Sequence, residues 1–231
     1  MKNVPPIYSL ILSGLMIILC GASCQKDDDN TNNNTSNVTD ADGNVYRSVA
    51  VGSQTWMSEN LKTTKYNDGL AIPNITGAVE WEELTTGAYC WYNNDVNNKT
   101  TYGALYNGHA VNTGRLCPVE WHVASDAEWT TLITYLGGES LAGGKLKETG
   151  TTHWSAPNAE ATNLSGLSFL PGGDRDFNGR FENITLAGYW WSSTANFSFS
   201  NWLRLIGNTG GAIARPSYNN EFGFSVRCVK N

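Results

Sequence analysis

The clearest pattern of metal-binding residue types lies between residues 174 and 182. Asp174, Asp176 and Asn178 stand at alternate positions and precede Gly179, which is the opening D-x-D-x-N-G pattern of a calcium loop. Calcium prefers such carboxylate and amide oxygens, and Glu182, at the ninth position, could complete the ligand set. The pattern predicts a calcium site at Asp174, Asp176, Asn178 and Glu182. The alternative is a polar hairpin that turns on Asn178-Gly179.

Two adjacent tryptophans, Trp190 and Trp191, are the residues best suited to stack on a ligand. They lie in a stretch that reads as a β-strand, and neighbouring side chains on a strand point to opposite faces. We therefore expect one of them in the core and the other on the surface, where it could stack on a sugar ring or anchor a protein interface. The alternative is that both belong to a tryptophan-rich core, since the chain has 9 tryptophans.

Cysteine chemistry is the third candidate. Two of the five cysteines lie near the N-terminus, which leaves Cys90, Cys117 and Cys228. Three thiols allow one disulfide in three alternative pairings. Cys90 stands among aromatic residues, which favours a buried free thiol that packs as a small apolar side chain. The alternative is that Cys90 is a reactive nucleophile, although nothing in the sequence places a histidine beside it to activate the thiol.

Other chemistry finds little support. The histidines show no metal-site spacing, and no nucleophile-elbow, Walker or dinucleotide-binding fingerprint is present. A net charge of −6 argues against a nucleic-acid-binding protein, which normally carries a basic face. Long helical stretches rich in alanine, leucine, glutamate and lysine are missing, which argues against a helix bundle or a coiled coil.

The elements that would position these residues are short. Residues 45–51 and 54–57 flank a Gly52-Ser53 turn and predict a β-hairpin. Ser125 and Glu128 form a capping-box pattern, followed by an apolar stripe from Trp129 to Leu136, which predicts a helix. Gly137-Gly138 should end that helix.

Further along, Leu141 to Lys147 predicts a short second helix, and strands are expected at 189–191, 201–206 and 222–229. In the last of these, Phe222, Phe224, Val226 and Cys228 share one side. The sequence therefore predicts an α+β fold with few helices, many short antiparallel strands and long loops. The uniform composition favours a single domain, because 40% of the chain is hydrophobic and no second linker interrupts it.

The first 40 residues are typical of export and tethering. The apolar run Ile7 to Leu19 is shorter than the ~20 residues of a membrane span and fits a signal peptide. Gly21-Ala22-Ser23 before Cys24 resembles the lipobox of bacterial lipoproteins, which implies a signal peptide at residues 1–23 and acylation of Cys24. The alternative is ordinary signal cleavage with a soluble product. Residues 24–40 are rich in Asn, Asp and Thr and predict a disordered tether.

The tether opens with Lys26 and the acidic run Asp27 to Asp29. This resembles the surface-export signal of Bacteroidota lipoproteins. The resemblance implies an outer membrane lipoprotein that is held in the membrane by its N-terminal lipid and exposed at the cell surface. The alternative is that the acidic run only keeps a linker soluble.

Six ordered blocks carry a second resemblance, to the Fibrobacter succinogenes major paralogous domain. The match extends over about residues 42–230, so we assign residues 41–231 to this domain. The blocks are Trp56–Leu61, Tyr89–Asp95, Tyr102–Asn107, Cys117–Val123, Gly188–Ser193 and Gly223–Cys228.

The family resemblance implies a fold and a cross-link but no activity. It implies a C-type-lectin-like fold and favours a disulfide between Cys117, before the first helix, and Cys228, in the last strand. C-type-lectin-like folds often use calcium, which agrees with the loop at Asp174. The Glu-Pro-Asn and Trp-Asn-Asp signatures of calcium-dependent lectins do not occur in their usual places. Glycan binding therefore cannot be transferred residue by residue.

These observations lead to one functional hypothesis and two alternatives. The favoured hypothesis is a non-enzymatic binding or adhesion module at the cell surface, with a glycan or a protein as its ligand. The first alternative is a thiol-dependent enzyme related in fold to formylglycine-generating oxidases, which would depend on Cys90. The second is a structural component of the cell envelope.

Overall fold

Three small antiparallel sheets carry the fold in the computed structural model, which describes residues 1–3 and 37–231. In the first, the order is β1 (Asn37–Thr39), β2 (Val45–Val51), β3 (Gln54–Met57), β13 (Cys228–Lys230), β6 (Trp121–Val123). In the second, it is β11 (Ser217–Asn219), β10 (Ser200–Gly207), β9 (Ala187–Phe197). In the third, it is β4 (Tyr89–Cys90), β5 (Leu105–Asn107), β12 (Gly223–Phe224), β7 (Asp174–Arg175), β8 (Phe181–Glu182). The predicted signal peptide and Cys24 lie outside the described residues.

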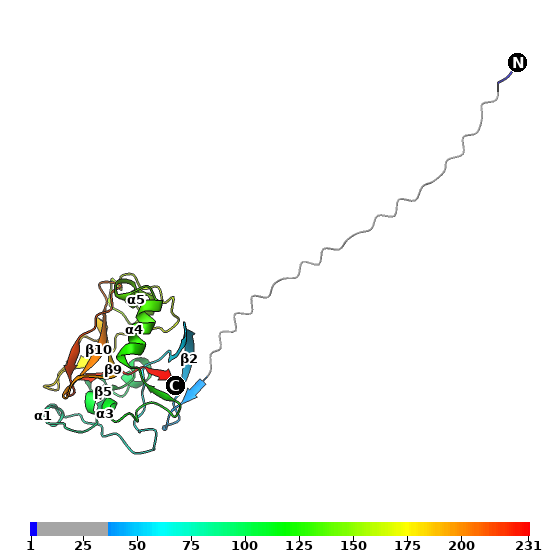
Figure 1. Cartoon of the computed structure of the whole chain (residues 1–231). Helices are drawn as coiled ribbons and strands as arrows, with labels where there is room; N and C mark the ends of the chain where they lie inside the picture. Colours follow the sequence, from blue (N-terminus) through cyan, green and yellow to red (C-terminus); the bar gives the residue numbers. More distant parts are fainter. Residues whose placement is uncertain (4–36) are drawn as a thin grey trace. The chain divides into compact units, whose positions relative to one another are not determined.

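The helices are few and short. They are α1 (Ala78–Glu82), α2 (Asn98–Tyr102), α3 (Gly108–Asn112), α4 (Asp126–Tyr135) and α5 (Glu139–Leu146), with a 3-10 turn η1 (Tyr92–Asn94). Figure 1 shows α4 and α5 at one end of the domain, β9 and β10 along one flank and β2 along the opposite flank. Antiparallel strands in curled sheets with few helices confirm the predicted α+β class. Within the described part of the chain, none of the helices is both long and apolar enough to cross a membrane.

The folded domain begins earlier than predicted. Residues 37–40 were assigned to the disordered tether, but β1 pairs with β2 and buries Val38. Asp40 is buried as well and organises the turn that follows. Its carboxylate accepts hydrogen bonds from the Asn44 side chain at 2.8 Å and from the Tyr46 hydroxyl at 2.6 Å. These bonds satisfy a carboxylate that would otherwise be costly to bury.

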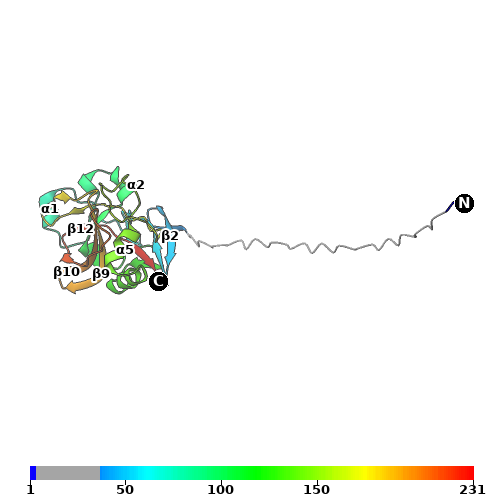
Figure 2. The ribbon, with the colours of Figure 1, turned by 90° about the horizontal axis from the view of Figure 1, so that it is seen from above.

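The predicted hairpin is confirmed as β2 and β3, which pair from Ser48–Met57 to Val51–Gln54. Tyr46 and Met57 join one core cluster, whereas Val51 and Trp56 join another. The sheet is therefore covered on both faces. Figure 2 shows the C-terminal strand beside these N-terminal strands, in agreement with the pairing of Val229 with Trp56.

Helix α4 forms where the capping pattern predicts it. The Ser125 side chain accepts a hydrogen bond from the backbone N–H of Glu128, and the Glu128 carboxylate accepts one from the backbone N–H of Ser125 at 2.8 Å. The apolar stripe buries Trp129 against Trp56, with ring centroids 4.8 Å apart. Beyond the helix, Gly137 takes φ +99°, the left-handed conformation that ends helices.

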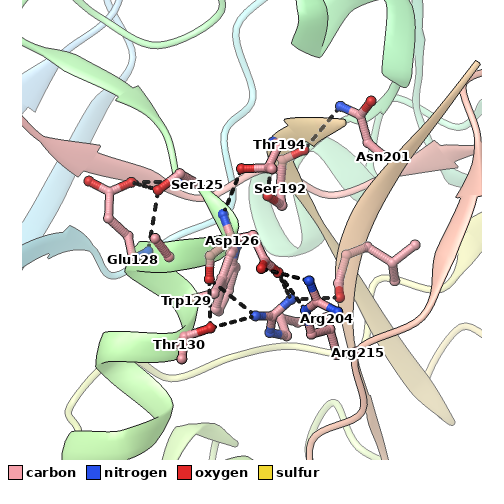
Figure 3. A network of polar contacts seen from close by, with 12 residues as sticks. Ser125, Asp126, Glu128, Trp129, Thr130, Ser192, Thr194, Asn201, Arg204 and Arg215 are labelled. Carbon is pink, nitrogen blue, oxygen red and sulfur yellow. Dashed lines mark hydrogen bonds and ion pairs between the residues drawn. The ribbon is translucent and has the colours of Figure 1, made fainter. Parts of the chain in front are cut away.

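A polar network fixes the first turn of α4 on the second sheet (Figure 3). Asp126 accepts hydrogen bonds from Arg204 Nη1 on β10 at 2.9 Å and from Arg215 at 2.8 Å. Its backbone N–H donates to the Thr194 hydroxyl of β9 at 3.0 Å. Arg204 is buried beneath the helix, so the ion pair with Asp126 compensates a desolvated guanidinium.

A disulfide joins Cys117 to Cys228, which confirms the pairing that the family resemblance implied. It connects the segment before β6 to strand β13, 111 positions later in the chain. Both cysteines are buried in the same core cluster. The bridge therefore reinforces the sheet on the side of β13 that pairs with β6.

Candidate functional site

Asn60 links four segments that carry the family resemblance. Its Nδ2 group donates to the Tyr102 carbonyl at 2.8 Å and to the Ser225 hydroxyl at 3.2 Å. Its Oδ1 atom accepts from Trp190 Nε1 at 2.9 Å and from Arg227 Nε at 2.7 Å. The amide is therefore satisfied on both sides, as a buried polar group must be.

A glycine allows this close packing. Gly103 has φ +77°, and a Cβ atom there would lie 2.7 Å from the Leu61 carbonyl oxygen and 2.8 Å from Asn60 Cβ. Only glycine tolerates both the left-handed backbone and the contact. The segment after β3 can thus approach the end of α2 directly.

Arg227 lies beside Asn60 and is 1% exposed. Its guanidinium stacks on the Phe169 ring, 4.2 Å from the centroid. Nε donates to Asn60, and Nη1 donates to the carbonyls of Met57 at 3.0 Å and Leu167 at 3.1 Å. Burial lowers the pKa of Arg227 to about 9, so the side chain remains a cation at neutral pH.

The remaining nitrogen of Arg227 is free. Nη2 makes no hydrogen bond to any described residue. It is also not one of the side-chain atoms that are both fully enclosed by protein and without a hydrogen-bond partner. It therefore still reaches solvent. A guanidinium with one unused donor is a binding element for an oxygen of a ligand.

Arg227 and Asn60 line a cleft of about 100 Å³. The segment after β3, strand β2, helix α2 and two loops supply its other walls. They contribute charged groups and hydroxyls around an otherwise small hollow. The remaining lining residues are Arg47, Ser58, Glu59, Lys62, Thr100, Thr101, Glu148, Ser168 and Leu170.

The acidic groups of the cleft already have partners. Glu59 pairs with Lys62 at 3.3 Å, and Glu148 pairs with His153 at 2.8 Å. By contrast, the Arg47 guanidinium makes no hydrogen bond or ion pair to a described residue. Neither do the hydroxyls of Thr100 and Thr101. The cleft therefore offers unused donors on two arginines and unused hydroxyls on α2.

Two wider hollows, of about 490 and 480 Å³, are weaker candidates. In the first, the buried carboxylate of Asp40 is already bonded within its own turn and to Tyr46. In the second, His109 turns Nε2 toward Glu221 at 3.8 Å. Neither hollow presents a buried guanidinium with an unused donor, as the cleft at Arg227 does, although the enclosed Nε2 atom of His109 has no hydrogen-bond partner among the described residues.

The predicted calcium ligands do not converge. Asp174 and Glu182 face each other across the β7–β8 hairpin, and the buried Asp174 carboxylate accepts from Asn183 Nδ2 at 2.8 Å. Asp176 uses its Oδ1 to accept from the Arg180 backbone N–H. Among the described residues, no three His, Cys, Asp or Glu side chains gather in a way that could hold a metal ion. The alternate residues instead serve a tight turn at Asn178 and Gly179, as the hairpin alternative predicts, and a calcium site here stays a prediction.

The tryptophan prediction was half right. Trp190 and Trp191 do point to opposite faces, since they belong to different core clusters. Both are 0% exposed, however, so neither is a stacking platform. Both faces of β9 are covered at the position of the two tryptophans, whereas the end of the strand toward Phe197 is exposed. The exposed aromatic residues of this sheet are Phe197 and Phe199 at the hairpin tip, 64% and 59% exposed and stacked on each other.

Cys90 is a buried free thiol, as its aromatic neighbours predicted. Burial raises its pKa to about 12, while the nearby Arg175 opposes that rise. At neutral pH it is therefore a protonated thiol without access to solvent, whereas a nucleophile must be an exposed thiolate. The described residues thus give the reactive-cysteine alternative no usable thiol.

The sequence reading missed the cleft. Its walls come from segments far apart in the chain, and local patterns do not report on such proximity. One signal was available, namely the charge of Arg227 within the largely apolar segment 222–229. A charge in such a place must find partners, and here it finds Asn60, two carbonyls and the cleft.

Comparisons with known proteins agree with the resemblance. A family model described as the Fibrobacter succinogenes major domain matches residues 49–230. Neither the curated proteins nor the solved structures gave a match. The matched range contains all the strands from β3 to β13 and every lining residue of the cleft except Arg47. The chain belongs to the Fibrobacter succinogenes major domain family.

Proposed function

We propose that the protein is a surface-exposed lipoprotein whose domain acts as a non-enzymatic binding module, with a glycan or a protein as its ligand. The cleft at Arg227 is the observation that carries this proposal. It combines a buried cation that keeps one unused donor with unpaired hydroxyls at its rim. Such preorganised groups bind a polar ligand without first breaking bonds of their own.

The proposed location rests on the sequence. Gly21-Ala22-Ser23-Cys24 supports acylation at Cys24, and Lys26 with its acidic run supports display on the outer face of the outer membrane. Mass spectrometry of the N-terminal peptide should find an acylated Cys24, and Cys24→Ala should release the protein from membranes. Protease treatment of intact cells should degrade the domain. An unmodified Cys24 or a protease-resistant domain would contradict the location.

We also propose kinship with the C-type lectin superfamily. The disulfide between Cys117 and the final strand supports it, as do the few helices and short antiparallel strands. An experimental structure tests this kinship by superposition of the two core helices and the paired terminal strands. A different strand order in the common core would reject it.

A binding screen tests the function. The detergent-solubilised full chain is applied to arrays of neutral and acidic glycans and to intact cell surfaces. We expect saturable binding that Thr100→Val together with Thr101→Val weakens, because these changes remove cleft hydroxyls but keep their shape. Phe197→Ser with Phe199→Ser is the matched control on the opposite sheet. Binding that depends on the phenylalanines and not on the threonines, or no binding at all, would contradict the proposal.

A further inference from the structure

We infer that the cleft at Arg227 recognises the carboxylate of an acidic sugar, such as a uronic acid residue of a polysaccharide. This inference rests on the proposed binding function and narrows its ligand. It depends on three features of the cleft, which are its unused charge, its hydroxyl and carboxylate acceptors, and its size.

The charged groups of the cleft that lack a partner are positive. Arg47, Lys62 and Arg227 line the cleft against Glu59 and Glu148. The two carboxylates are already paired, with Lys62 and His153 respectively. Arg47 and the Nη2 group of Arg227 are the cationic donors left without a partner. A carboxylate is an anion whose oxygens match such guanidinium donors in charge and geometry.

Arg227 is also preorganised. The guanidinium packs over the Phe169 ring. Three acceptors bonded to Nε and Nη1 also hold it in place. Little side-chain entropy is lost when Nη2 takes up a further acceptor. Because the residue is 1% exposed, water screens its charge less than it screens a surface arginine.

The remaining groups favour a sugar over an acidic peptide. Glu59 and Glu148 can accept hydrogen bonds from ligand hydroxyls, and Thr100 and Thr101 can donate or accept. A uronic acid supplies a carboxylate together with several hydroxyls. A run of acidic peptide side chains supplies carboxylates without hydroxyls, so it would leave these hydrogen-bonding groups unused.

The volume sets the part of the ligand that enters. About 100 Å³ equals roughly three times the share of one water molecule in the liquid. That space suits a carboxylate with the adjoining ring atoms and is too small for a chain of several sugars. We therefore expect recognition of one acidic unit, with the rest of the saccharide lying outside.

Calorimetry with the full chain in detergent tests the inference. The probes are trigalacturonate, its methyl ester, neutral galactotriose and a hexa-aspartate peptide. We expect trigalacturonate to bind at least ten-fold more tightly than the other three. Arg47→Gln should weaken trigalacturonate about three- to ten-fold. Arg180→Gln, which removes another exposed arginine that does not line the cleft, should leave it unchanged.

Arg227→Lys is the sharper variant, because it keeps the charge but removes Nη2. It should weaken trigalacturonate at least ten-fold, provided that its thermal unfolding remains cooperative. If it fails to fold, Arg47→Gln still decides. An unchanged affinity of Arg47→Gln would overturn the inference.

The other outcomes separate this inference from the proposed function. Equal affinity for all three sugars would overturn the carboxylate and support a glycan-binding module. Preference for hexa-aspartate would overturn the sugar and support a protein ligand. No binding of any of the four probes would overturn the inference, while the array and cell-surface screen would still decide the binding function.

Discussion

Buried cations bind loops together in this domain. Arg175, Arg204, Arg227 and Lys147 are each at most 1% exposed. Arg175 donates to the carbonyls of residues 75, 76, 77 and 179 and lies between the Trp81 and Phe181 rings. Lys147 donates to the carbonyls of residues 159, 207 and 210. Loop-rich chains must satisfy many carbonyls outside helices and sheets, and a single cation satisfies several at once.

Cys90 provides a test at the scale of one residue. Because the thiol is fully buried and its pKa is raised to about 12, iodoacetamide at pH 8 should leave it unmodified in the folded protein. The same reagent in 6 M guanidinium should modify it completely. Mass spectrometry reads both states, and rapid labelling of the folded protein would contradict the burial.

Asp174 provides a second test, which concerns pH. Burial raises its pKa from 3.8 to about 6, while Asn183 lowers it and Glu182 and Asp176 add to the rise. Between pH 4 and 6 the folded state therefore holds a proton that the unfolded chain has released. This contribution to the free energy of unfolding falls as pH rises through that window, by about 2 kcal/mol.

The variant Asp174→Asn removes this dependence. Urea unfolding of both proteins at pH 4, 5, 6 and 7 should show the variant gaining stability relative to the wild type as pH rises. Other titrating groups cancel in the difference. A difference that stays constant from pH 4 to 7 would contradict the assignment.

At the scale of elements, α4 depends on one carboxylate. Asp126 joins the first turn of the helix to Arg204 on β10 and to Arg215. The Arg204 side chain is 1% exposed, so Asp126→Asn leaves a buried guanidinium without its counter-charge. We expect a loss of about 3 kcal/mol in the free energy of unfolding.

Arg215→Gln is the matched control. Its side chain is 36% exposed, so breaking its ion pair and its stacking on Trp202 should cost about 1 kcal/mol. Urea unfolding monitored by tryptophan fluorescence compares the two variants. Equal losses would mean that the buried pair does not hold α4 in place.

The sequence predicted the elements whose signals are local. The Ser125 capping box, the glycines after α4 and the turn at Gly52 each report on a few neighbouring residues, and all three were found. Strand alternation also predicted that Trp190 and Trp191 diverge. It could not predict that both would be covered, because that depends on segments distant in the chain.

The candidate site could not be predicted from local sequence patterns either, because its residues are also distant in the chain. Asn60 lies 42 positions from Tyr102 and 167 positions from Arg227 in the chain, so no local pattern reports that they meet. The residues of the calcium pattern show the opposite situation. They are close in sequence, but the turn at Gly179 directs Asp174 and Asp176 to different partners. Spacing alone therefore did not decide what the oxygens bind.

At the scale of the whole molecule, the disulfide closes a long loop. Linking Cys117 to Cys228 restricts the unfolded chain over 111 positions. Replacing both by alanine should lower the free energy of unfolding by about 2–5 kcal/mol. Cys90→Ala is the control, since it removes a buried sulfur without opening a loop. Urea unfolding should rank the double variant well below the control, and equal stabilities would contradict a structural role for the bridge.

The position of β13 between β3 and β6 has a consequence for how the chain reaches this fold. Val229 pairs with Trp56, 173 positions earlier. The ribosome therefore synthesises the hairpin β2–β3 long before the strand that covers its edge. Until then Trp56 and the unpaired edge of β3 can form non-native contacts with other chains. Contacts of such high sequence separation slow folding, so the nascent domain needs protection from aggregation until its last strand is made.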